Sequence, residues 1–154
     1  MNEQFPRSPY DALRGLVYFP RMLDKIRLHA AGRLPEVYQK HLGDGFDGRC
    51  LRLLGVPYEE VRRLVLAGEP DEAVFDWCMA NGRLLTEEEI ETWSGFMLKR
   101  GWRDEASERV VVRIKESHLE GRDREIATMF DYIDIDEGRT PPDFRKWEPP
   151  RLGA

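Results

Sequence analysis

The sequence predicts an all-α fold, a compact bundle of about six to eight short helices with an extended, proline-rich and aromatic C-terminal tail. Three observations lead to this prediction. Apolar residues recur three and four positions apart, as on one face of a helix, and glycine or proline ends most of these segments. Helix-capping signals precede several of them. Finally, 41% of the residues are apolar and 34% are charged, which suits a packed core beneath a charged surface.

The length of 154 residues suits one domain with one hydrophobic core. We expect a single helical domain over 1–138 and an extended tail over 139–154, where closely spaced prolines prevent a regular helix.

Two helices are expected near the N-terminus. Ser8 and Pro9, with Asp11 shortly after them, resemble a capped helix start, so we predict a first short helix that ends near Gly15. Pro20 opens a second, amphipathic helix that runs to Gly32. The segment 34–45 is polar and rich in turn residues, which favours a loop or a broken helical turn.

Three more helices follow, separated by short connections. Their apolar stripes cover 46–54, 57–67 and 71–80, and each ends at a glycine or at Asn81-Gly82. Short connections of this kind are typical of antiparallel neighbouring helices.

The C-terminal half begins with a strong signal, since Thr86 and Glu89 have the spacing of a capping box ahead of a helix that ends at Gly101. The stretch 104–120 is predicted as a helix, although the β-branched residues Val110–Val112 are also compatible with a short strand. A final helix is expected from about Asp123 to Gly138.

Charge and targeting features narrow the functional classes. The net charge of −5 and the pI near 5.3 argue against binding to nucleic acid or to an anionic membrane surface, because both require a basic face. Cys50 and Cys78 lie in apolar helical patterns without CxxC spacing, which indicates reduced core thiols rather than a disulfide. The sequence contains neither a secretory leader nor a long apolar segment, so we expect a cytoplasmic protein.

Several short segments match a known family. They are Ser8-Pro9-Tyr10, Gly15, the run FPRMLDKIRLHAAGRL, the run FDGRCLRLLGV and the two helices that end at Asn81-Gly82. With these segments the chain resembles a bacterial family catalogued as domain of unknown function 5069. The resemblance implies a small bacterial helical domain, and it implies no activity, cofactor or catalytic residue.

The densest group of reactive side chains lies in the second predicted helix and just before it. Residues three and four apart are neighbours on a helix. Arg21 and Lys25 could therefore hold a carboxylate or phosphate while Asp24 orients them, with Tyr18 and His29 nearby. The alternative is a structural ion pair that joins this helix to its neighbour.

Metal and cofactor signatures are missing from the sequence. The three histidines and two cysteines show no HxxxH, HExxH or CxxC spacing, and no phosphate-binding loop or nucleophile elbow occurs. We therefore predict no metal and no cofactor, and the sequence identifies no catalytic residue.

Two functional hypotheses remain. The first is a non-catalytic intracellular binding or interaction module whose charged stripe and aromatic tail contact a protein partner or a second copy of the chain. The second is a small enzyme or ligand-binding protein for a small anionic molecule, with a pocket near Tyr18 to His29. A deep cavity lined by this cluster would favour the second hypothesis.

Overall fold

The computed structural model describes residues 2–142, and these residues form a mostly helical fold with one small hairpin. The strands are β1 (Ala12–Leu13) and β2 (Leu16–Val17). The helices are α1 (Phe19–Ala30), α2 (Glu36–Gln39), α3 (Phe46–Leu54), α4 (Tyr58–Leu66), α5 (Asp71–Asn81), α6 (Glu87–Lys99), α7 (Ser107–Glu116), the 3-10 helix η1 (Glu120–Glu125) and α8 (Met129–Asp136). The predicted all-α class is confirmed. Most of the expected tail, 143–154, lies outside the described residues.

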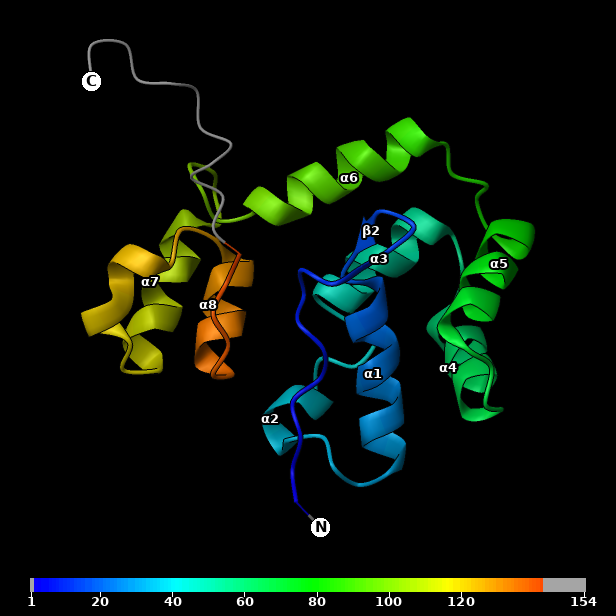
Figure 1. Ribbon diagram of the computed structural model, residues 1–154, viewed down its shortest axis with the longest axis horizontal. Coiled ribbons are helices and arrows are strands. Elements are labelled where there is room, and N and C mark those ends of the chain that lie inside the picture. The colour runs from blue at the N-terminus through cyan, green and yellow to red at the C-terminus, as the bar shows by residue number, and fades with distance from the viewer. Residues whose placement is uncertain (1, 143–154) are drawn as a thin grey trace.

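The helices form two groups connected by α6 (Figure 1). Helices α1 to α5 make up the larger group, and α7 and α8 lie together at the other end of the molecule. Helix α6 runs along one side of the fold from α5 to α7. The N-terminal segment passes between the two groups before it enters α1 (Figure 1).

The expected first helix at Ser8 is wrong, because this region forms the β1–β2 hairpin. The Ser8 hydroxyl oxygen accepts a hydrogen bond from the Tyr10 backbone N–H at 3.1 Å, which is a local turn and not a helix cap. Arg14 and Gly15 both have positive φ angles, 49° and 84°, as a two-residue hairpin loop requires.

The middle helices begin and end close to the predicted stops. Pro20 lies in the first turn of α1, and Gly55 ends α3 in the left-handed conformation. The capping box of α6 is present, with reciprocal bonds between Thr86 and Glu89. Short α2 falls within the segment predicted as a loop or broken turn.

In the C-terminal half, one prediction is confirmed and one is wrong. Val110–Val112 lie inside α7, so the helical alternative is the correct one. The single final helix from Asp123 is instead divided into η1 and α8. The division falls at Thr128, whose hydroxyl accepts a hydrogen bond from the Asp131 backbone N–H at 3.1 Å and caps a new helix.

The buried hydrophobic residues form two clusters. The main cluster is built by the hairpin, α1 and α3 to α6, and a smaller one includes Val110, Ile114 and Met129. Phe46 packs against both clusters, while Phe130 of α8 belongs to the main cluster. Helices α3 and α8 therefore connect the two groups at the level of the core.

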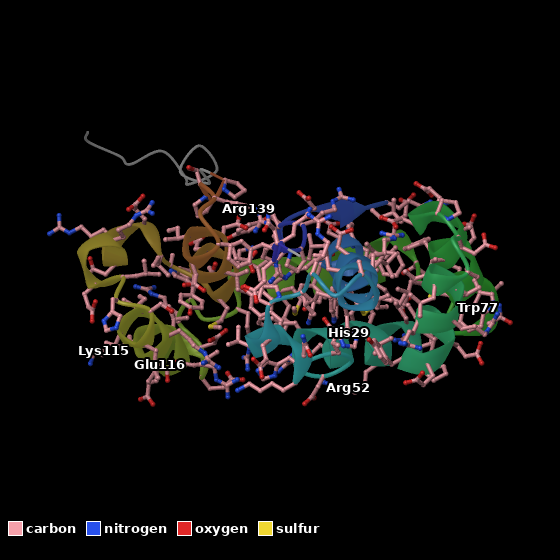
Figure 2. The ribbon with its side chains drawn as sticks, turned by 90° about the horizontal axis from the view of Figure 1, so that it is seen from below. His29, Arg52, Trp77, Lys115, Glu116 and Arg139 are labelled. Carbon is pink, nitrogen blue, oxygen red and sulfur yellow. The ribbon has the colours of Figure 1, made fainter. Side chains whose placement is uncertain are left out.

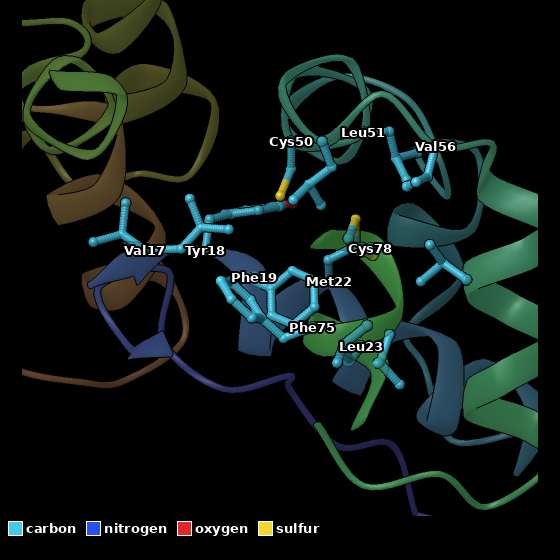
Figure 3. Close-up of a cluster of buried hydrophobic side chains, with 14 of the residues drawn as sticks. Val17, Tyr18, Phe19, Met22, Leu23, Cys50, Leu51, Val56, Phe75 and Cys78 are labelled. Atoms are coloured by element: carbon cyan, nitrogen blue, oxygen red, sulfur yellow. The ribbon is translucent and has the colours of Figure 1, made fainter. Parts of the chain in front are cut away.

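Both cysteines belong to the main cluster, as Figure 3 shows beside Met22 and Phe75. Each is 0% exposed and neither forms a disulfide, so the predicted burial is confirmed. Across residues 2–142, we find no helix with the length and apolar character needed to cross a membrane.

Candidate functional site

A cleft of about 650 Å³ separates the two helical groups. One wall comes from α1, α2, α3 and the segment between α2 and α3, and the other comes from the end of α6, α7 and α8. Cavities of roughly 300–1,000 Å³ are the size that holds small organic ligands. This cleft is therefore the candidate functional site.

Positive side chains dominate the lining of the cleft. Eight Arg and Lys residues line it against four Asp and Glu residues, a surplus of four positive charges, although the whole chain has a net charge of −5. The eight cations are Arg21, Lys25, Lys40, Arg49, Arg52, Arg100, Arg109 and Arg113. The protein is thus acidic as a whole, whereas the lining of this cleft is basic.

Arg21 forms a buried ion pair with Glu137 between α1 and the end of α8. Its two terminal nitrogens donate to the two carboxylate oxygens at 2.8 and 2.6 Å, and the side chains are only 5% and 0% exposed. Tyr38 and Arg139 donate to the same carboxylate. Burial alone would raise the pKa of Glu137, but these hydrogen bonds and the charge of Arg21 hold it below its ordinary value.

Lys25 forms a second buried pair, one helical turn along α1. Its Nζ donates to Asp47 Oδ1 at 2.9 Å, and the Tyr18 hydroxyl donates to the same oxygen at 2.6 Å. The backbone N–H of Gly43 donates to the other oxygen at 3.0 Å. Burial lowers the pKa of Lys25, and Asp47 offsets part of this effect. The carboxylate thus holds together α1, α3 and the loop before α3.

Three of the five residues predicted for the site line the cleft, namely Tyr18, Arg21 and Lys25. Asp24 lies elsewhere on α1, where it accepts a hydrogen bond from Arg27 at 3.3 Å and another from the Arg7 backbone N–H at 3.1 Å. His29 is exposed near the end of α1 and lies outside the lining (Figure 2). Asp24 therefore does not orient Arg21 and Lys25, whose carboxylate partners come from α3 and α8.

Sequence reasoning missed four further cations that line the cleft. Within residues 2–142, the side chains of Lys40, Arg49, Arg52 and Arg109 have no ion-pair partner. In the sequence they form charged helix faces, which are usually solvated surfaces. Only the fold, which brings α3, α7 and the end of α2 to one cleft, identifies them as members of one site.

His41 reports on this positive environment. Its side chain lines the cleft, and its pKa is lowered by burial and then by the charges of Lys40, Lys25 and Arg113. A neutral imidazole is the expected state at pH 7. An anion that enters the cleft would act in the opposite direction, so His41 is a natural probe of occupancy.

The chemistry of the lining suits binding of an anion. Arginine presents planar N–H donors that match carboxylate and phosphate oxygens. In the described part of the chain, no group of three or more His, Cys, Asp and Glu side chains is arranged to hold a metal ion.

Fold and site together define a small helical protein with a basic cleft above two buried ion pairs. The chain belongs to the family described as domain of unknown function DUF5069, whose model matches residues 3–139. The resemblance seen in the N-terminal half is thus confirmed, and the match extends through α8. A comparison with curated proteins found no similar sequence.

Proposed function

We propose that this protein is a non-catalytic binding module that holds a small anionic molecule in the cleft between α3 and α7. The observation that carries the proposal is the set of four lining cations that lack an ion-pair partner within residues 2–142. Exposed cations that converge on a cleft lower the energy of an incoming anion, and the low-dielectric walls strengthen this effect.

In this proposal Arg21 and Lys25 shape the site and do not supply its main attraction. Their charges are already balanced by Glu137 and Asp47 at hydrogen-bonding distance. An anion that displaced either carboxylate would leave a buried charge without its partner, which is costly. The ligand is therefore expected to contact mainly the arginines of α3 and α7.

The hypothesis of an interaction module, in which Arg21 and Lys25 of α1 contact a protein partner, remains an untested prediction. The side chains of Arg21 and Lys25 are only 5% and 6% exposed, so these two cations offer little surface to another protein. The aromatic tail that completes that hypothesis lies outside the described residues. We therefore propose a small anionic ligand, and not a protein partner, as the molecule that this protein binds.

A cytoplasmic location and a bacterial origin belong to the same proposal. Two unpaired thiols in the core are typical of proteins from a reducing compartment. A small-molecule binding role is compatible with that compartment.

Thermal unfolding in phosphate tests the proposal, with sodium chloride at equal ionic strength as the reference. At ten times its Kd, a ligand that binds only the folded state adds about 1.4 kcal/mol of stability. For a chain of this size, this corresponds to a rise in Tm of roughly 3–6 °C. We expect the rise in the wild type and its loss in a variant that combines Arg52→Gln with Arg109→Gln.

A matched control combines Lys115→Gln with Arg124→Gln. Both residues are exposed and lie outside the cleft lining, and the change in net charge is the same. The control should keep the rise in Tm. Equal behaviour of the two double variants would contradict binding in the cleft.

A second readout uses the imidazole of His41. Phosphate in the cleft should raise the pKa of His41, because a nearby negative charge favours the protonated ring. Nuclear magnetic resonance titration of the histidine signals measures this shift, and His29, outside the cleft, serves as the reference. An unchanged His41 titration in saturating phosphate would place the anion elsewhere.

A further inference from the structure

The unpaired cations lie on both walls of the cleft. Arg49 and Arg52 are three residues apart on α3, and Arg109 and Arg113 are four residues apart on α7. These spacings place each pair on one face of its helix. Within residues 2–142, the one ion pair of Arg113 is an exposed pair with Glu116 on its own helix, at 3.0 Å.

The two walls are not bonded directly to each other. Within residues 2–142, no ion pair or side-chain hydrogen bond joins α3 to α7. Figure 2 shows the two sides, with Arg52 on α3 and Lys115 and Glu116 at the end of α7. Like charges on facing walls repel, so this arrangement is unfavourable while the cleft is empty of anions.

The size and charge of the cleft select among anions. A volume of about 650 Å³ is much more than a single inorganic ion needs. The lining includes Phe46, Met129 and Ile133, which offer apolar surface to an organic body. Four lining cations have no ion-pair partner within residues 2–142, and two phosphate groups, which together carry about three to four negative charges, match their number better than the two charges of a dicarboxylate.

We infer that the ligand of this cleft is an organic diphosphate whose two linked phosphate groups contact the arginines of α3 and of α7 at the same time. This inference rests on the proposed function and adds the ligand class and the way it is held. Each phosphate accepts hydrogen bonds from the arginine N–H groups of one wall. The negative charge of the ligand also reduces the repulsion between the arginines of the two walls. The organic body contacts the apolar lining residues.

Isothermal titration calorimetry with inorganic phosphate and inorganic pyrophosphate, at equal ionic strength, tests the inference on the full chain. We expect pyrophosphate to bind about tenfold or more tightly than phosphate, since only pyrophosphate contacts both walls. Equal affinities for the two anions would overturn the diphosphate assignment.

Single variants on each wall complete the test. Arg52→Gln removes a cation from α3 and Arg109→Gln removes one from α7, and both side chains are exposed, so neither change should disturb the fold. Each should weaken pyrophosphate binding by about fivefold or more. Lys115→Gln, on α7 but outside the cleft, should leave the affinity unchanged.

The outcomes separate this inference from the proposed function. If only one wall affects pyrophosphate binding, or if pyrophosphate and phosphate bind equally, the cleft still binds anions but the bridging diphosphate is wrong. If neither anion binds, or if all variants behave like Lys115→Gln, both the inference and the proposed function fail.

Discussion

The carboxylate of Glu137 offers the sharpest test of how this fold is held together. We consider Glu137→Gln, which keeps the shape of the side chain and removes its charge. In the wild type this fully buried carboxylate accepts hydrogen bonds from Arg21, Tyr38 and Arg139. The neutral amide would leave Arg21 buried without a counter-charge and would turn an NH₂ group toward N–H donors.

Removal of one partner from a buried ion pair costs about 3–5 kcal/mol of folding free energy. Arg139, whose side chain is 29% exposed, admits water to one side of this network, so we expect the lower end of that range. A loss of about 3 kcal/mol lowers Tm by roughly 6–12 °C in a chain of this size. Urea unfolding monitored by circular dichroism measures the change.

Glu125→Gln is the matched control, because Glu125 pairs with Arg122 at the surface, where both side chains are about half exposed. It should leave Tm almost unchanged. The difference between wild type and Glu137→Gln should also depend on pH. Because the pKa of Glu137 is depressed in the folded state, its contribution is complete above its ordinary value of 4.5 and is lost as the pH falls below it. A Glu137→Gln variant as stable as the Glu125→Gln control would refute the ion-pair reasoning.

Three further predictions concern Asp134, the two cysteines and two glycines. Asp134→Asn should raise the stability of the fold at pH 7, because burial raises the pKa of Asp134 and its Oδ1 lacks a hydrogen-bond partner. Calorimetry should show this gain in stability disappearing as the pH falls toward 3.8, the ordinary pKa of an aspartate. Cys50→Ser should lower the free energy of unfolding by about 1–3 kcal/mol, as measured in urea. Both native thiols should resist a thiol reagent at pH 8, because burial raises the pKa of Cys50 and brings that of Cys78 to about 11. Gly82→Ala should lower the free energy of unfolding by about 1–3 kcal/mol, since an added Cβ would lie 2.2 Å from the Leu54 carbonyl oxygen. Gly95→Ala, inside α6 with open space around it, should raise the free energy of unfolding by about 0.5–1 kcal/mol. Equal Tm values for the two variants would contradict the packing argument.

Much of the helical fold could be predicted because its signals are local. Helix α6 carries its capping box within four residues, and α3 carries its glycine stop directly after its last apolar residue. The hairpin was missed because a serine followed by a turn makes the same local hydrogen bond as a serine before a helix. The break at Thr128 was missed because the apolar period continues across it.

The candidate site was only half predictable for a different reason. The helical period correctly brings Tyr18, Arg21 and Lys25 to one side of α1. Their partners cannot be read from that period, since Asp47 lies 22 residues beyond Lys25 and Glu137 lies 116 residues beyond Arg21. The same period places Asp24 three residues from both Arg21 and Arg27, and in the fold Asp24 pairs with Arg27.

The bonds between the N-terminal segment and the last helix determine when the protein can complete its fold. The Ser8 hydroxyl donates to Asp134 at 3.0 Å, Tyr10 donates to Asp131, and Arg139 donates to the carbonyl oxygen of Pro6. The N-terminal segment therefore needs α8 and the residue Arg139 before these bonding groups are satisfied. Until then Arg21 has no Glu137 beside it, and one wall of the cleft lacks the part that α8 supplies. Premature termination just before α8 would thus remove the counter-charge of Arg21 and leave the cleft incomplete.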